Sequence, residues 1–210
     1  MEQDTVYREL CKTFTLLKDL RDSHKDIKES NARKYCYNYW VYVAEKMHAI
    51  ECANLEQNSK CLDISTGVGL LPFILKNMGH ACDATDIIDP LHDMDTDVQD
   101  NSVTQVNAFR VIRDVHSVSI NELRIEKNKY INLPTQYDCI FSMRVVWDTG
   151  WGKTDDCYKF IINNLLDYSK KVVISWNMDG IDDIPPVLLP YVTQEQFEYG
   201  TLTIHTEKII

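Results

Sequence analysis

The sequence predicts an α/β protein with a doubly wound, mostly parallel sheet of six to seven strands and an N-terminal helical extension. Three observations support this prediction. Short apolar runs alternate with helical patterns between residues 58 and 177, which indicates parallel strands joined by right-handed crossovers. A small-residue turn follows the first of these strands and opens a helix. The 210 residues, 44% of them hydrophobic, are enough for one such domain with a sizeable core.

We expect the extension to cover residues 1–55 and the α/β domain to cover residues 56–210. Two helices are predicted in the extension, over 3–20 and from about 31 to 51, because apolar residues recur there at spacings of three and four. The face of the second helix that packs on the domain is expected to carry Cys36, Trp40, Val43 and Met47. A second row on this helix contains Tyr35, Tyr39 and Tyr42. Packing is the favoured interpretation of that row, and a ligand contact by Tyr35 and Tyr39 is the alternative.

The segment 60–79 predicts a strand, a tight turn and a helix. Cys61, Leu62 and Ile64 form a short apolar run, and apolar residues at helical spacing follow from Leu70 to Met78. Between them, the residues 65–69 are small, and glycine allows a backbone to approach a ligand closely. This unit brings backbone N–H groups and a helix N-terminus to a ligand.

The remaining elements are predicted from their apolar patterns. An acidic segment, residues 89–100, is interpreted as a solvated loop, because it lacks the glycine and the bidentate glutamate of a calcium loop. The tail is expected to hold one short helix at most. The expected strands are 80–87, 116–120, 136–143, 171–177 and 201–205, and the expected helices are 98–113 and 155–168.

The turn resembles motif I of the class I S-adenosylmethionine-dependent methyltransferases, which reads Asp-x-Gly-x-Gly-x-Gly after a strand. Asp63, Gly67 and Gly69 match this motif, and Ser65 stands in the place of its first glycine. The stretch from Leu133-Pro134 through Tyr137-Asp138 into an apolar strand resembles the opening of motif IV in the same family. The resemblance implies a Rossmann-like fold, S-adenosyl-L-methionine as the cofactor and methyl transfer to an acceptor.

Further site residues follow from position and from the resemblance. Asp86 lies seventeen residues after Gly69, near the end of the second expected strand, where a carboxylate can bind both ribose hydroxyls. A solvated loop carboxylate is the alternative, and Asp83 and Asp89 are nearby competitors for the role. The resemblance implies that a polar residue just past the third strand, Asn121 or Glu122, binds the adenine. The predicted cofactor-binding residues are Asp63, Ser65, Gly67, Gly69, Asp86, Asn121 and Ser142. No metal site is predicted.

The acceptor side is predicted in the segment 144–152, which follows the fourth strand. Asp148 is the candidate general base, with a solvated loop carboxylate as the alternative. Arg144, Trp147 and Trp151 are candidates for acceptor binding, by pairing, stacking or cation–π contact. The alternatives are a structural salt bridge for Arg144 and anchoring of the loop by the two tryptophans. The Asp/Asn-Pro-Pro-Tyr/Phe motif of nucleic-acid amino-methyltransferases is absent, and the net charge is −10. Both features favour a small molecule or a protein side chain over nucleic acid.

Two other functions remain open at this point. A non-catalytic partner subunit with the same fold is one, and a nicotinamide-dependent oxidoreductase is the other, although its Gly-x-Gly-x-x-Gly fingerprint is absent. The seven cysteines show no CxxC pair, which favours a reducing compartment. Neither a signal peptide nor a bilayer-spanning run is found, so a cytoplasmic protein without a membrane partner is expected. The oligomeric state is open.

Overall fold

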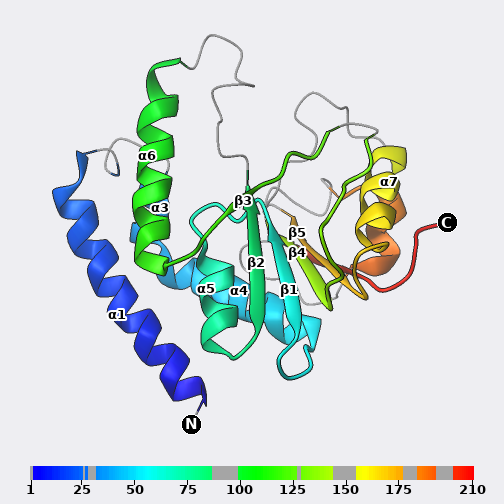
Figure 1. The fold of residues 1–210 in the computed structure, drawn as a ribbon, viewed down its shortest axis with the longest axis horizontal. Helices are drawn as coiled ribbons and strands as arrows, with labels where there is room; N and C mark the ends of the chain where they lie inside the picture. The colour runs from blue at the N-terminus through cyan, green and yellow to red at the C-terminus, as the bar shows by residue number, and fades with distance from the viewer. Residues whose placement is uncertain are drawn as a thin grey trace.

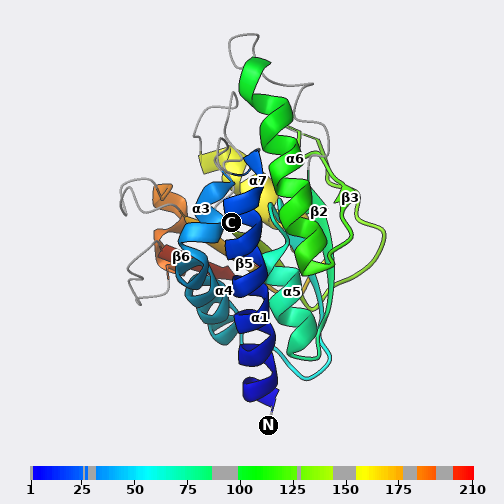
Figure 2. The same ribbon diagram turned by 90° about the vertical axis from the view of Figure 1, so that its left-hand side faces the viewer.

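The computed structural model describes residues 2–25, 27, 32–86, 99–126, 129–143, 155–176, 184–192 and 201–210. These residues form one six-stranded sheet with the strand order β3-β2-β1-β4-β5-β6, covered by helices on both faces (Figures 1 and 2). The strands are β1 (Lys60–Ile64), β2 (Ala81–Asp86), β3 (Asn121–Glu122), β4 (Cys139–Met143), β5 (Val172–Trp176) and β6 (Thr201–His205). The first five run parallel, and β6 pairs with β5 antiparallel. This is the strand order of a doubly wound sheet, which confirms the predicted fold class.

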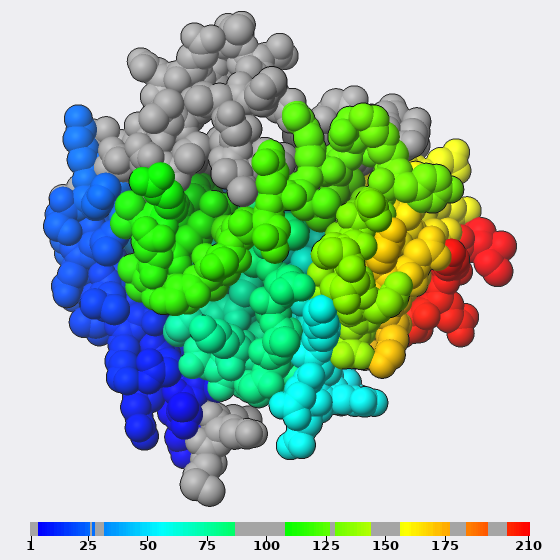
Figure 3. All heavy atoms as spheres, viewed as in Figure 1, coloured from blue at the N-terminus to red at the C-terminus, as the bar shows by residue number. Residues whose placement is uncertain are grey.

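The helices are α1 (Glu2–Ser23), α3 (Arg33–Tyr37), α4 (Tyr39–Ala53), α5 (Leu70–Asn77), α6 (Gln99–His116), α7 (Asp155–Leu165) and the 3₁₀ helix η4 (Pro186–Tyr191). Successive strand residues alternate between two cores. Cys61 and Phe141 face the core that contains α1, α3, α4, α5 and α6, whereas Leu62 and Ile140 face the core that contains α7 and η4. In the space-filling view α6 lies beside the N-terminal helix, and the C-terminal segment lies at the opposite side (Figure 3).

The second predicted helix is interrupted at Asn38, which has φ −106° and ψ 27°. The N–H of Asn38 donates to the carbonyl oxygen of Lys34, which is the last backbone hydrogen bond of α3. The carbonyl oxygen of Asn38 accepts the first backbone hydrogen bonds of α4, from the N–H groups of Val41 and Tyr42. The expectation of one continuous helix over 31–51 was therefore wrong at this residue. Lys34 and Tyr35 of α3 line the cavity described below.

The third strand was misplaced in the sequence prediction, which put it at residues 116–120. His116 is the last residue of α6, and Ser117 ends that helix with a φ of +53°. The actual strand, β3, consists of Asn121 and Glu122, which pair with Thr85 and Asp86. Residues 116–120 resemble a strand in their alternation, but tertiary contacts with the turn after β1 hold them instead.

The other elements agree with the prediction to within a few residues at their ends. The strands at 60–64, 81–86, 139–143, 172–176 and 201–205 were all predicted, as were the helices α1, α5, α6 and α7. Gly79 adopts a φ of +87° after α5, as expected for a helix C-cap.

Candidate functional site

A cavity of about 280 Å³ lies at the carboxyl ends of β1 and β4. This is the topological switch point of the sheet, where ligands of doubly wound proteins bind, and it is the place that the sequence predicted. Three parts of the chain form its walls: the turn after β1, the helices α3 and α4, and the end of β4. The lining residues are Lys34, Tyr35, Tyr42, Lys46, Asp63, Ser65, Thr66, Gly67, Val68, Leu70 and Met143.

The turn after β1 has a left-handed backbone at three positions. Ser65, Gly67 and Gly69 have φ values of +57°, +60° and +76°. Glycine adopts this conformation freely, whereas at Ser65 it costs about 1–2 kcal/mol. The N–H of Thr66 donates to the carbonyl oxygen of Thr85 at 3.0 Å, which ties the turn to β2. The motif therefore forms the tight turn that was predicted, with a strained serine in place of one glycine.

Asp63 is a buried carboxylate that lines the cavity, 2% exposed. Its Oδ1 atom has no hydrogen-bond partner among the residues that the structure describes. Burial raises the pKa of Asp63 to about 7, while Thr66 and Lys46 act in the opposite direction. Buried polar groups are usually hydrogen-bonded, so this oxygen can accept a hydrogen bond from a molecule bound in the cavity.

Lys46 projects from α4 into the same cavity and is also buried. Its Nζ lies 3.7 Å from Oε2 of the neighbouring Glu45. The other oxygen of Glu45 accepts a hydrogen bond from the Ser175 hydroxyl at 2.9 Å, which anchors α4 to β5. The cavity is thus lined by a carboxylate and an ammonium group in a region of low dielectric, where both attract opposite charges strongly.

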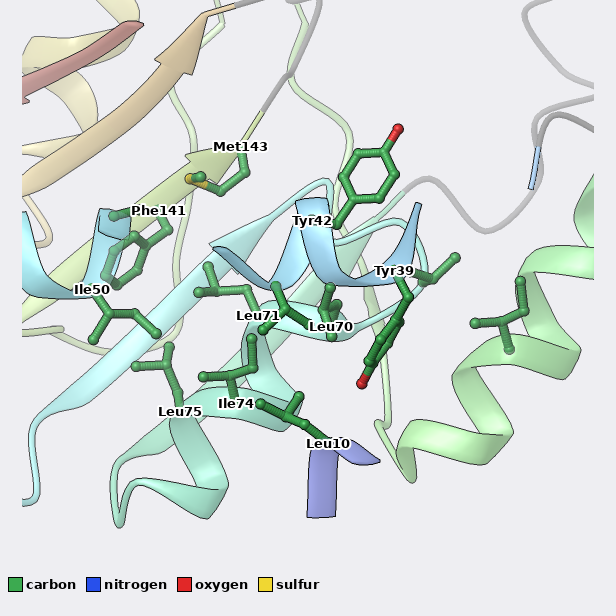
Figure 4. Close-up of a cluster of buried hydrophobic side chains, with 14 of the residues drawn as sticks. Leu10, Tyr39, Tyr42, Ile50, Leu70, Leu71, Ile74, Leu75, Phe141 and Met143 are labelled. Atoms are coloured by element: carbon green, nitrogen blue, oxygen red, sulfur yellow. The ribbon is translucent and has the colours of Figure 1, made fainter. Parts of the chain in front are cut away.

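Aromatic side chains of α3 and α4 line another part of the cavity. The rings of Tyr35 and Tyr42 lie 4.7 Å apart, and Tyr35 meets the ring of Phe109 edge-on at 5.8 Å. Tyr39 belongs instead to the hydrophobic core, where it is 1% exposed. Figure 4 shows the hydroxyls of Tyr39 and Tyr42 pointing in opposite directions. Of the tyrosines considered from the sequence as ligand contacts, Tyr35 lines the cavity and Tyr39 does not.

Asp86 lies at the end of β2, as predicted, and its carboxylate binds the turn. Its Oδ2 accepts the N–H of Gly67 at 2.9 Å and forms an ion pair with Arg113 at 2.8 Å. Arg113 in turn donates from Nε to the carbonyl oxygen of Gly67. Asp86 is therefore linked to the Gly turn in two ways: directly, by the hydrogen bond from Gly67, and indirectly, through Arg113.

The remaining candidates are placed less centrally or lie outside the described residues. Asn121 is exposed in β3. Ser142 is fully buried in β4 opposite Ile64, so it faces the core of α7 rather than the cavity. The acceptor-side candidates Arg144, Trp147, Asp148 and Trp151 lie outside the described residues.

The sequence analysis missed several residues of the site. Lys46 and Tyr42 come from a helix whose composition also fits an ordinary packed helix, so no local signal set them apart. Arg113 is a cation in the last turn of a helix, which is a common position for a purely local contact. Thr66 was the one position with a usable signal, because it lies inside the turn itself.

Other kinds of site are not found in the described part of the chain. Within it, no three His, Cys, Asp or Glu side chains are grouped so that they could hold a metal ion. All seven cysteines are free thiols. No helix among the described residues combines the length and the apolarity that crossing a membrane requires.

No protein-family model matches the sequence, and no curated protein matches it. The structure is similar to the magnesium protoporphyrin IX methyltransferase ChlM from Synechocystis, with 14% identity and a TM-score of 0.48 over 91% of this chain and 95% of that one. It is similar to a TehB-like SAM-dependent methyltransferase from Corynebacterium glutamicum, with 14% identity and a TM-score of 0.47 over 84% of this chain and 97% of that one.

A third similar structure is the glycopeptide N-methyltransferase MtfA, with 12% identity and a TM-score of 0.43 over 72% of this chain. The match spans only 54% of the length of MtfA. All three TM-scores lie below 0.5, and the chemistry of this chain is therefore inferred below from its own residues. These three solved structures are methyltransferases, the class that the motif around Asp63 resembles.

Proposed function

We propose that this protein binds S-adenosyl-L-methionine in the cavity after β1 and transfers its methyl group to a small-molecule acceptor. One observation carries the proposal: the buried Asp63 carboxylate, with its unpartnered Oδ1, and the Lys46 ammonium open into one cavity beside the Gly turn. An amino acid carries an ammonium and a carboxylate on one carbon. The two side chains are thus complementary to the methionine end of this cofactor.

The described residues fit the rest of the cofactor as well. Gly67 and Gly69 allow the backbone of the turn to come close to a ligand, and a side chain on either would enter occupied space or force a strained φ. For Asp86, whose carboxylate accepts the N–H of Gly67 in the turn, we propose a contact with the ribose hydroxyls. Among the similar structures, MtfA was solved with sinefungin and ChlM with SAM.

The proposed chemistry asks this chain for binding and alignment. The bound cofactor supplies an electrophilic methyl group on a sulfonium centre, which carries the difficult part of the reaction. Asp63 would accept hydrogen bonds from the ammonium and Lys46 would pair with the carboxylate, which would align the cofactor for transfer. Asn121 remains a proposed cofactor contact on the strength of the motif resemblance alone, whereas Ser142 is not proposed further because its side chain faces away from the cavity.

For the acceptor we propose a small molecule, with a protein side chain as the alternative. A net charge of −10 disfavours polyanionic nucleic acid. Asp148 is the proposed general base, and Arg144, Trp147 and Trp151 are the proposed acceptor contacts. We further propose that the protein acts in the cytoplasm.

Titration calorimetry tests the proposal directly. We expect S-adenosylmethionine and S-adenosylhomocysteine to bind in one-to-one stoichiometry and NAD not to bind. Binding of NAD alone would favour the nicotinamide-dependent oxidoreductase. Binding of S-adenosylmethionine without methyl transfer to any pool of small molecules, proteins or RNA would favour the non-catalytic partner subunit.

The Asp86→Ala substitution should weaken cofactor binding by about 1.5–3 kcal/mol, the range for hydrogen bonds to a charged group. The matched control is Asp83→Ala on the same strand. Asp83 accepts a hydrogen bond from the Tyr137 hydroxyl at 3.0 Å, whereas Asp86 accepts one from the Gly67 N–H of the turn. Neither carboxylate is among the residues that line the cavity, so the comparison isolates the contact of Asp86 with the turn. Calorimetry on both variants, with thermal unfolding in parallel, separates binding from stability. Equal and small losses of affinity in the two variants would remove Asp86 from the site.

On the acceptor side, Trp147→Ala and Asp148→Asn should lower the turnover number at least about tenfold and change cofactor affinity less than about twofold. Groups that contact only the acceptor affect kcat without affecting donor binding. The measurement is transfer of a labelled methyl group, after a screen of metabolite pools has identified an acceptor. Label in RNA or DNA with none in metabolites would show the small-molecule proposal to be wrong.

A further inference from the structure

Side chains on one face of α6 contact the Gly turn, and methyl transfer itself does not require these contacts. Phe109, Arg113 and His116 lie on this face, four and three residues apart. Phe109 Cε1 is 3.6 Å from the place that a Cβ on Gly67 would occupy. Arg113 donates to the carbonyl oxygen of Gly67, and His116 donates from Nδ1 to that of Val68 at 2.7 Å.

Arg113 and Asp86 together hold both backbone polar groups of Gly67. The N–H of Gly67 donates to Asp86 Oδ2 at 2.9 Å, and Arg113 Nη2 lies 2.8 Å from the same oxygen. Nε of Arg113 donates to the carbonyl oxygen of Gly67, which completes a ring of hydrogen bonds among Arg113, Asp86 and Gly67. The planar guanidinium makes these two bonds at once, which the single ammonium of a lysine cannot reproduce in the same geometry.

This ring of bonds is largely shielded from water, with side-chain exposures of 17% for Arg113 and 18% for Asp86. It acts on a glycine, the residue that loses the most conformational freedom when it is ordered. A turn that is already ordered before the ligand arrives costs less to bind. The contacts of Arg113 therefore order the backbone of the turn before binding, and they are not contacts with the ligand.

We propose that Arg113 is a positioning residue of the cofactor site: by bridging Asp86 and the Gly67 carbonyl, it holds the Gly turn and the Asp86 carboxylate in the arrangement that the cofactor meets. The cofactor part rests on the proposed function. The ordering of the turn does not, and it can be measured on the full chain without any ligand.

Hydrogen–deuterium exchange on the ligand-free chain tests the ordering. In Arg113→Gln we expect the segment 65–69 to exchange at least about tenfold faster, while the strand segment 139–143 keeps its wild-type rate. The matched control is Arg110→Gln, at an exposed position on the same helix, which should leave both segments unchanged. Unchanged exchange at 65–69, or equal acceleration of both segments, would overturn the proposal.

Calorimetry then tests the consequence for the cofactor. The Kd for S-adenosylmethionine should rise at least about tenfold in Arg113→Gln, and Arg113→Lys should recover only part of the loss. Millimolar guanidinium should restore binding to Arg113→Ala and not to Asp86→Ala. Tighter binding by Arg113→Gln would mean that Arg113 competes with the cofactor and would overturn the proposal. If the wild-type chain binds no S-adenosylmethionine, the proposed function and the cofactor role of Arg113 both fall, and the exchange experiment still decides whether Arg113 orders the turn.

Discussion

Gly67→Val should abolish binding of S-adenosylmethionine, with a loss of affinity of at least about 100-fold, or about 2.7 kcal/mol. A Cβ at this position would lie 3.6 Å from Phe109 and 3.7 Å from the Tyr35 hydroxyl, which are ordinary contacts, so the chain itself has room for it. The added methyl groups would fill the space through which the cofactor approaches the turn. Calorimetry on the purified variant measures the loss.

The matched control for this prediction is Gly79→Val. Gly79 has a φ of +87°, has no neighbouring atom within 4 Å of an added Cβ, and lies beyond the far end of α5. Both variants force a side chain into the left-handed region at a cost of about 1–2 kcal/mol, so their thermal unfolding should shift similarly. Only the change at Gly67 should affect binding, and Gly67→Ala should do so in milder form. A folded Gly67→Val protein with wild-type affinity would refute the site.

Asp63→Asn should weaken cofactor binding by about 1.5–3 kcal/mol at pH 7.5, because it replaces a carboxylate that faces an ammonium by a neutral amide. Asn has nearly the same shape as Asp, so the loss of affinity would not come from a void left in the packing. The control is Asp83→Asn, whose side chain contacts Tyr137 outside the cavity. Calorimetry of the three proteins decides the matter, and wild-type affinity in Asp63→Asn would contradict the assigned contact.

The raised pKa of Asp63, about 7, also predicts how binding and stability depend on pH. The carboxylate is mostly protonated at pH 6, so cofactor affinity should increase about five- to tenfold between pH 6 and pH 7.5, and Asp63→Asn should lose this dependence. Without ligand, the folded state holds this proton more tightly than the unfolded state. Its contribution to stability is complete below about pH 4 and is lost as pH rises to about 7. Asp63→Asn should therefore unfold at a higher temperature than the wild type at pH 8, but not at pH 4.

The strand, turn and helix around the site followed from the sequence because they depend on a few consecutive residues. Leu62 and Ile64 define an apolar strand, and a turn of small residues with two glycines can hardly continue it. The position of Asp86 followed for the same reason, since the length of the connecting helix places it at the end of the next strand. The parallel order of the strands followed from the alternation of strands with helices.

The third strand shows where local pattern stops being sufficient. Val118 and Ile120 alternate with polar residues as strand residues do. Val118 nevertheless packs against Gly69, within 3.2 Å of the place of an added Cβ, and the sheet pairs with Asn121 and Glu122 instead. Contacts between residues that are distant in sequence determine which residues pair with β2, and the periodicity of a local segment contains no information about such contacts.

By itself the sequence determined the fold class, the Gly turn and the edge of the sheet at which the cavity forms, because each depends on local spacing and turn chemistry. The tertiary structure alone decided which side chains line that cavity. Helical spacing identifies the apolar face of α4, but not that Lys46 lies across from Asp63. Ser142 and Met143 are neighbours with opposite orientations, and only the register of β4 against β1 turns Met143 to the face of Asp63 and Ser142 away from it.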